Sequence, residues 1–371
     1  MSFILEVADR WSHKILEALQ RFPLASLSSF IVTFLLIIIV EGNRFSQSLF
    51  MLISYKLAFV ISLGIFLFPT LHLLTKSVWF KLVGLGLLAL YYYLLPLNIL
   101  DSTIIVRHIL FIFALVFMFF WAPFMDVSIS NKNIWEWTQN ILLILLAMIL
   151  LSFAFYAIFF VTMYALNHLF GISLATVRYV QVAIAIVGLF SVNYFLAHLP
   201  KYIMLVQTNR YANIGLVFTK YILTPIFLIY FLILFAYIVK IIIENRWLST
   251  NIDSLALGYT VVAIATYMYW TPLWNEPNRK FRIFLWGSLL ILSLILATQI
   301  WFQIQALEVE VYSLMSLFTL WLLLVSSYFL FFEKASYKWL LFSISLFIVL
   351  SQSEHLINMS VKLFKNVSKM V

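Results

Sequence analysis

The chain contains no cysteine, which excludes disulfide bonds, thiolate metal sites and cysteine nucleophiles. Charged residues make up only 10% of its 371 residues, against about 25% in a typical soluble domain. Glycine and proline are scarce, at 9 and 8 residues, and no stretch rich in them divides the chain. The sequence also lacks a G-x-S-x-G elbow, a phosphate-binding loop and an H-E-x-x-H zinc motif, so no motif names a chemistry.

What the chain does have is long apolar runs, about eleven of them, placed almost end to end. One helical crossing of a bilayer needs about 20 apolar residues, and only helices or closed barrels satisfy their own backbone hydrogen bonds in lipid. The runs lack the alternation of barrel strands. We therefore predict an all-α, polytopic integral membrane protein with about eleven transmembrane helices, within a range of ten to twelve. The predicted spans are 24–40, 50–74, 78–97, 104–121, 141–166, 177–198, 221–243, 255–271, 283–304, 311–332 and 338–351.

The two ends of the chain differ from this apolar middle. Residues 1–23 place apolar side chains at helical spacing between charged ones, which predicts an amphipathic interfacial helix rather than a cleavable signal peptide. Residues 24–351 are expected to form a single helical membrane domain. Residues 352–371 again alternate apolar side chains with lysines, which suits an amphipathic tail on the membrane surface.

The distribution of Lys and Arg predicts the orientation, because cytoplasmic loops carry an excess of both. Loops on the side of the N-terminus hold 14 of them, the opposite loops hold 6, and the C-terminal tail holds three lysines. We therefore expect a cytoplasmic N-terminus and, after eleven crossings, an outward C-terminus. The longest predicted loops, 122–140 and 199–220, fall on the cytoplasmic side, where Trp121, Trp135 and Trp137 resemble interfacial anchors.

Ionisable residues near the membrane boundary are the default candidates for function, because burying them in lipid costs several kcal/mol. On the outward side, the candidate binding residues are Glu41, Arg107, His108 and Arg178. In one interpretation, their side chains reach the headgroups and pair loosely with one another. In the other, they line an outward polar vestibule in which the arginines bind an anionic headgroup while Glu41 and His108 move protons. In either case we expect Arg178 to face protein or a wet cavity.

The sequence gives little indication of a metal, cofactor, catalytic or nucleic-acid site. No two of the six histidines are three or four residues apart, so we predict no metal site, no cofactor and no catalytic residue. The net charge of +9 is attributed to basic loops near anionic lipid. No basic run is interleaved with aromatic residues, so no nucleic-acid partner is expected. Pro69 and Pro225 are expected to bend their helices for packing.

Three segments resemble an uncharacterised bacterial family of polytopic membrane proteins known as domain of unknown function 4153. They read RFPLASLSSFIVTFLLIIIVE, FTKYILTPIFLIYFLILFAYIVKIIIENRWLS and VYSLMSLFTLWLLLVSSYFLF. The shared features include Phe-Pro before the first span and tyrosine-led later spans. The family usually has an arginine before the tenth span, where this chain reads EVEVY, so no role of that arginine is transferred. The resemblance implies the bacterial inner membrane and no assigned activity.

The expected function follows from these features together. We expect a protein of the bacterial inner membrane that transports or handles a lipid-linked or amphiphilic anionic molecule, with membrane lipids as partners. One alternative is a non-enzymatic accessory or assembly subunit, which would have a membrane-protein partner or a second copy of itself. The other is an envelope-precursor transferase. An enzyme is the less favoured class, because it requires convergent acid and base groups that the sequence does not reveal.

Overall fold

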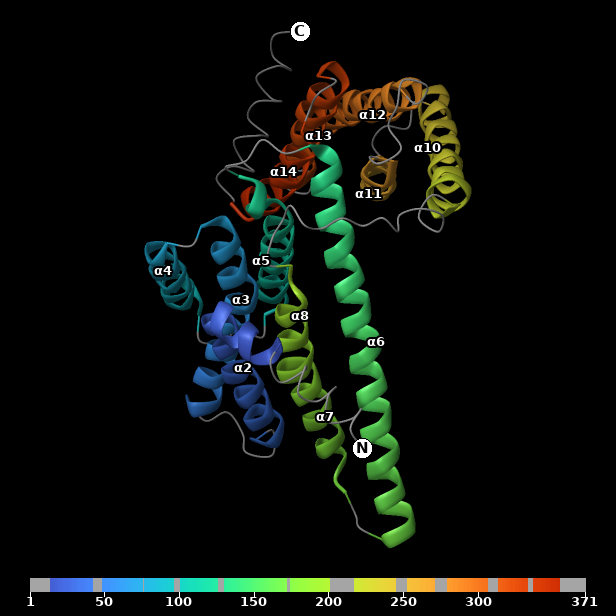
Figure 1. The fold of residues 1–371 in the computed structure, drawn as a ribbon. Coiled ribbons are helices and arrows are strands. Elements are labelled where there is room, and N and C mark those ends of the chain that lie inside the picture. The colour runs from blue at the N-terminus through green and yellow to red at the C-terminus, as the bar shows by residue number, and fades with distance from the viewer. Residues whose placement is uncertain are drawn as a thin grey trace. The chain divides into compact units, whose positions relative to one another are not determined.

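The computed structural model describes residues 14–42, 49–75, 77–96, 101–125, 130–171, 174–200, 217–244, 252–270, 279–305, 313–332 and 336–353. Every regular element within these ranges is helical (Figure 1). The expectation of an all-α protein is confirmed. The predicted interfacial helix is described only from residue 14, and residues 14–21 are helical. The rest of that helix and the tail from residue 354 lie outside the described residues.

Eleven apolar helices lie within the described ranges. Nine are long and apolar enough to cross a membrane, and two shorter ones cover Val78–Leu94 and Tyr337–Leu350. They correspond one to one with the predicted spans, because each span arises from a mostly apolar run, and nine of these runs reach bilayer length. The chain is therefore a helical, multi-pass membrane protein.

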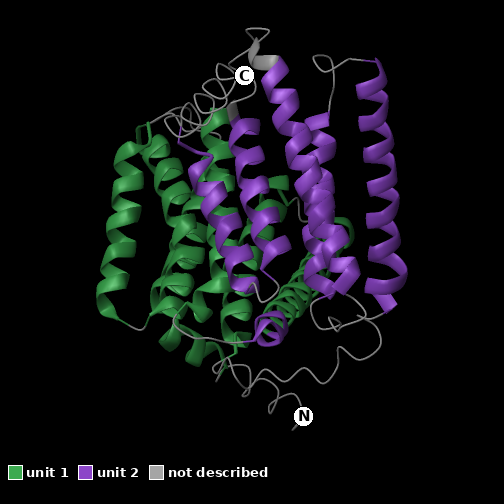
Figure 2. Cartoon of the chain, turned by 90° about the horizontal axis from the view of Figure 1, so that it is seen from above, with its two compact units in different colours: residues 1–128, 137–206 green, residues 129–136, 207–371 purple. Residues whose placement is uncertain are grey.

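The chain forms two compact units, which Figure 2 shows in green and purple. The interpretation of residues 24–351 as a single membrane domain stays a prediction. Unit 1 covers residues 1–128 and 137–206, and unit 2 covers 129–136 and 207–371. Unit 1 contains α2 (Pro23–Gly42), α3 (Leu49–Leu74), α4 (Val78–Leu94), α5 (Ser102–Trp121), the 3-10 turn η1 (Ala122–Phe124), α7 (Thr176–Ala185), the π-helical turn η2 (Ile186–Ser191) and α8 (Val192–His198). Unit 2 contains the π-helical turn η4 (Phe218–Leu223), α10 (Thr224–Glu244), α11 (Ile252–Trp270), α12 (Arg279–Gln305), α13 (Ser313–Phe331) and α14 (Tyr337–Leu350).

Unit 1 is built around close packing of α2. Its buried face carries Ala25, Ser29 and Thr33, which are small residues at helical spacing. Small side chains let membrane helices approach closely, where packing and hydrogen bonds stabilise the contact. Ser29 Oγ donates to the carbonyl oxygen of Gly188 in η2, and a Cβ at Gly188 would overlap Thr33 Oγ1. Glycine at position 188 is therefore required by the approach of η2 to α2.

Unit 2 has an aromatic centre. Trp286 of α12 stacks on Phe329 of α13 with ring centroids 4.7 Å apart, and Tyr267 of α11 meets the Trp286 ring edge-on at 4.9 Å. Trp286, Phe329 and Tyr337 are almost fully buried. Offset and edge-to-face arrangements of this kind are the favoured geometries of aromatic pairs. These rings fill the space between α11, α12, α13 and α14.

The prediction of a long loop at 122–140 is wrong, because most of these residues are helical. The helix α6 (Asn131–Phe170) starts in unit 2 and continues in unit 1. Asn131 and Lys132 interrupt the apolar run in the sequence, but solvated side chains do not prevent a helix from extending. Lys132 lies 4.0 Å from Glu136, one turn along. At 1.5 Å per residue, this helix is about 60 Å long, twice the thickness of a hydrocarbon core of about 30 Å.

The three tryptophans expected at the membrane interface are instead buried. Trp137 packs against Phe119 and Phe124 within unit 1, and Trp135 meets Tyr269 edge-on within unit 2 at 4.8 Å. The interpretation as interfacial anchors is wrong because all three side chains face protein: Trp121 at the end of α5, and Trp135 and Trp137 in the first turns of α6. Their apolar area stabilises each unit instead of its contact with headgroups.

Prolines affect two helices in different ways. Pro69 lies buried inside α3, which continues past it for five residues. Pro225 is the second residue of α10, directly after η4, and Thr224 Oγ1 donates to the Thr219 carbonyl 2.7 Å away. A proline cannot donate a backbone hydrogen bond. Directly before it, the Thr219 carbonyl accepts from both the backbone N–H and the hydroxyl of Thr224, as the wider π turn allows.

Candidate functional site

Two of the four sequence-predicted residues form an ion pair in unit 1. Arg178 Nη1 lies 2.9 Å from Glu41 Oε2, and Nη2 lies 3.3 Å from Oε1, so the pair is bidentate. Gln181 bridges both partners, donating to Glu41 Oε2 at 2.7 Å and accepting from Arg178 at 2.7 Å. The expectation that Arg178 faces protein is met through Glu41 and Gln181, with the side chain about half exposed. Because Glu41 already compensates its charge, Arg178 serves mainly as a tie between α2 and α7.

His108 belongs to a different cluster, between α3, α4 and α5. Its ring stacks on Phe59 at 3.6 Å, Nε2 lies 2.9 Å from Ser62 Oγ, and Nδ1 lies 3.2 Å from Tyr91 Oη. The residue is buried. The structure thus places His108 inside the protein among uncharged neighbours, while Glu41 and Arg178 meet each other elsewhere in the unit.

The hydrogen bonds of His108 argue against a serine nucleophile. A serine–histidine pair supports nucleophilic catalysis when the histidine accepts the serine proton. Here Ser62 Oγ donates to the Phe59 carbonyl at 2.7 Å, and a hydroxyl has a single proton to donate. Nε2 of a neutral His108 must therefore carry a hydrogen and donate to Ser62, while Nδ1 accepts from Tyr91. This arrangement is a satisfied structural network.

Arg107 completes the predicted set. It precedes His108 on α5 but is exposed, on a different face of the helix from the buried imidazole. The structure therefore brings Glu41 and Arg178 together. Arg107 is exposed, whereas its neighbour His108 is buried. Ligand binding by any of the four stays a prediction. The Glu41–Arg178 pair agrees with the interpretation that boundary charges pair with one another.

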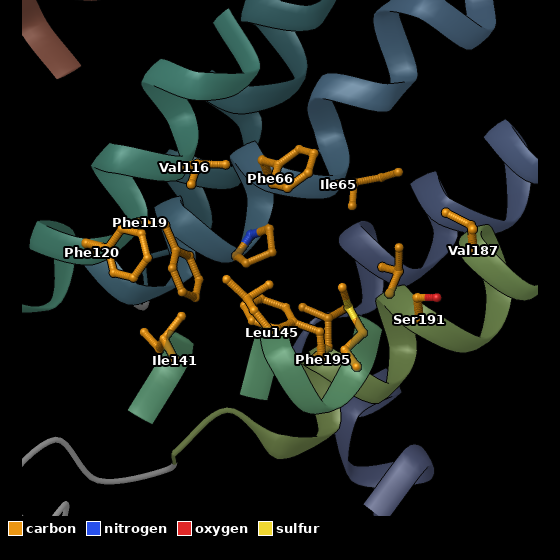
Figure 3. A pocket seen from close by; sticks show the side chains of 14 residues that line it. Ile65, Phe66, Val116, Phe119, Phe120, Ile141, Leu145, Val187, Ser191 and Phe195 are labelled. Atoms are coloured by element: carbon orange, nitrogen blue, oxygen red, sulfur yellow. The ribbon is translucent and has the colours of Figure 1, made fainter. Parts of the chain in front are cut away.

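A site that the sequence reasoning missed is an apolar cavity in unit 1, of about 220 Å³ (Figure 3). Side chains of α3, α5, α6, η2 and α8 point into it. Thirteen of the fourteen lining residues are apolar, and Ser191 is the exception. The full set is Ile65, Phe66, Pro69, Val116, Phe119, Phe120, Ile141, Leu145, Met148, Val187, Ser191, Val192, Phe195 and Leu196.

The π-helical turn η2 forms one wall of this cavity. Val187 and Ser191 both line it, and π turns are frequent at functional sites. The hydroxyl of Ser191 donates to the Ile186 carbonyl at 3.0 Å and lies 2.7 Å from Ser152 Oγ. Because both hydroxyls are engaged with the protein, the cavity surface behaves as apolar. Its chemistry suits a hydrocarbon group rather than a polar one.

No sequence signal marked this cavity strongly. The only sequence features near it are the single hydroxyls of Ser152 and Ser191 within apolar runs, and Pro69. Its walls come from helices far apart in the sequence, so only their packing creates the space. Within the described part of the chain, no group of three or more His, Cys, Asp or Glu side chains is placed to hold a metal ion.

Fold and site together define the class of this protein: a helical, multi-pass membrane protein with an apolar cavity among its helices. No known protein family, no curated protein and no solved structure matches the chain.

Proposed function

We propose that this protein binds an amphiphilic, lipid-linked anionic molecule in the bacterial inner membrane and handles or transports it. The observation that carries the proposal is the apolar cavity of unit 1. An apolar cavity of about 150 Å³ is large enough to bind benzene, and this one measures about 220 Å³. It can accommodate part of an acyl or prenyl chain, whose chemistry matches its walls.

The physics of such binding differs from that in water. A chain that leaves lipid for the cavity gains no hydrophobic free energy, because lipid tails are as apolar as the walls. Selectivity then comes from shape and from the many small dispersion contacts of a close fit. Stable retention of one molecule therefore calls for a second, polar contact at the membrane boundary.

The location and orientation belong to the same proposal. The excess of Lys and Arg on the N-terminal side supports a cytoplasmic N-terminus. The resemblance of three segments to an uncharacterised bacterial family supports the inner membrane.

A second candidate, the accessory or assembly subunit, is favoured by the far end of α6. Leu169 and Phe170 are 73% and 71% exposed there, and α6 is about twice as long as a hydrocarbon core is thick. An apolar helix end beyond the bilayer would need a cover, which a partner protein can supply. The transferase alternative stays an expectation: its convergent acid and base groups are not supplied by His108, whose ring nitrogens contact Ser62 and Tyr91.

The test uses the whole protein in nanodiscs, followed by delipidation and native mass spectrometry. We expect the wild-type protein to retain a lipid, and Leu145→Trp to lose it, because the indole fills the cavity. Leu146→Trp is the matched control: the neighbouring residue on α6 is 54% exposed and does not line the cavity. Equal retention by both variants would refute binding in the cavity. Retention of a protein partner without lipid would establish the accessory role.

A further inference from the structure

A second hollow in unit 1 adjoins the apolar cavity. It has a volume of about 290 Å³ and lies where helical residues 14–21 meet the end of α8. Glu17, Gln20 and Arg21 line it, together with Leu196 and Leu199. Leu196 also lines the apolar cavity, so this one side chain belongs to both walls. We call this hollow the polar crevice.

Arg21 is held in a defined position in the polar crevice. Its Nη1 donates to the Leu199 carbonyl at 2.9 Å and its Nη2 to the Pro200 carbonyl at 2.9 Å. The guanidinium also lies 4.8 Å from the centroid of the Phe22 ring. A guanidinium has five N–H donors in a rigid plane. Two serve the carbonyls, so three remain to bind an external acceptor, and the plane is already oriented.

The charge at this position is permanent. Partial burial lowers the pKa of Arg21 and the nearby Glu17 carboxylate raises it, but a guanidinium stays protonated in proteins. Arginine matches the geometry of a phosphate group through paired hydrogen bonds. Gln20 adds a side-chain amide to the same wall. Because Glu17 is also there, the crevice suits one phosphodiester charge better than several.

We propose that Arg21 and Gln20 bind the phosphodiester headgroup of a membrane lipid whose hydrocarbon chain occupies the adjoining apolar cavity. This inference rests on the proposed function and specifies its polar contact. The headgroup contact supplies the retention that an apolar cavity in lipid lacks. With the N-terminus in the cytoplasm, the bound lipid belongs to the cytoplasmic leaflet. The proposal also moves the anion site away from Arg107 and Arg178, where the sequence alone had suggested it.

The experiment compares two lipids with the same chains, phosphatidylglycerol and diacylglycerol, which differ in the phosphodiester headgroup. Full-length protein is delipidated in maltoside micelles, which contain no phosphodiester, then offered each lipid and weighed by native mass spectrometry. We expect the wild-type protein to retain phosphatidylglycerol about tenfold more than diacylglycerol, as a charge-assisted hydrogen bond predicts. Equal retention of the two lipids would overturn the headgroup site while leaving chain binding intact.

Variants then locate the effect. Arg21→Gln should abolish the preference but keep diacylglycerol, and Arg21→Lys should keep part of the preference. Lys14→Gln is the matched control, because it removes the same charge from an exposed position of the same segment. Leu145→Trp should lose both lipids.

A preference that survives Arg21→Gln in a protein with unchanged thermal stability would overturn the assignment. Loss of neither lipid on Leu145→Trp would instead refute the proposed function.

Free glycerol phosphate distinguishes a lipid headgroup from a soluble phosphate. Added in excess together with the lipid, it should not displace phosphatidylglycerol, because it lacks the chain. Displacement would mean that the polar crevice binds a soluble phosphate ester without help from the cavity, which would also overturn the proposal.

Discussion

Unit 1 and unit 2 solve the packing of a membrane core in different ways. In unit 1, small residues bring α2 close to its neighbours, yet a cavity of about 220 Å³ remains among the helices. In unit 2, Trp286, Tyr267, Phe329 and Tyr337 fill the centre with aromatic rings. The difference teaches where the chain can bind a ligand. Unit 1 keeps an apolar cavity among five of its helical segments, whereas the hollow of about 350 Å³ in unit 2 lies beside the aromatic centre, between α13 and α14.

The largest expected effect tests the filled centre of unit 2. Trp286→Ala removes a fully buried indole that contacts two rings, so the free energy of unfolding should fall by about 3–5 kcal/mol. Denaturant titration in mixed micelles measures it. Phe331→Ala, at a 73% exposed position of α13, is the control and should change little. If Leu145→Ala at the cavity of unit 1 costs as much as Trp286→Ala, the contrast between the units is wrong.

A smaller effect is expected where unit 1 is tightly packed. Gly188→Ala places a methyl group against Thr33 Oγ1, and overpacking of this kind costs about 1–3 kcal/mol. Gly86→Ala is the control, because its added Cβ meets nothing within 4 Å. The double variant Gly188→Ala with Thr33→Ala should recover most of the lost stability in the same titration. Failure to recover would place the defect in the π turn itself.

His108 and Arg107 allow a sharper test within α5. His108→Phe keeps the stacking on Phe59 but removes the acceptor of Tyr91 Oη, so the free energy of unfolding should fall by about 1–2 kcal/mol. Arg107→Ala, one residue earlier and exposed, should have almost no effect on unfolding. A larger loss for Arg107→Ala than for His108→Phe would show that the exposed arginine, and not the buried histidine, supports the helix.

The smallest effect is expected for the ion pair between α2 and α7. Both side chains are about half exposed, and exposed ion pairs contribute about 0.2–1 kcal/mol. A double-mutant cycle with Glu41→Gln and Arg178→Gln should give a coupling energy in this range that decreases as salt is added. A coupling energy well above it, insensitive to salt, would mean that the pair is shielded from water and would reopen the vestibule interpretation.

Particular elements show how far the sequence predicts this structure. Each apolar run became a helix, and most ends are close to those expected: the run at 50–74, for example, became Leu49–Leu74, whereas the run at 141–166 became Asn131–Phe170. The prediction failed at 122–140, where polar residues interrupt the apolar run but α6 already begins at Asn131, with Trp135 and Trp137 of its first turns packed on protein. Hydropathy identifies segments that can cross lipid, but it does not identify a polar helical segment that packs on protein.

For the candidate site, the sequence identified the charges but not their partners. Glu41 and Arg178 were both candidates, and they pair across 137 positions of the chain. His108 looked like a boundary residue, yet it is enclosed by Phe59 and Ser62 of α3 and Tyr91 of α4, side chains that no local pattern brings to it. The apolar cavity had no usable signature, because its lining residues look like ordinary lipid-facing ones.

The sequence by itself determined that the chain is a helical, multi-pass membrane protein. The reason is that the bilayer demands apolar runs of a given length and internal hydrogen bonding, and both are local properties of the chain. Only the tertiary structure decided which polar groups meet and where space remains. Leu196 comes to line both the apolar cavity and the crevice that holds Arg21, because helices distant in the sequence pack around it, and no local pattern encodes that packing.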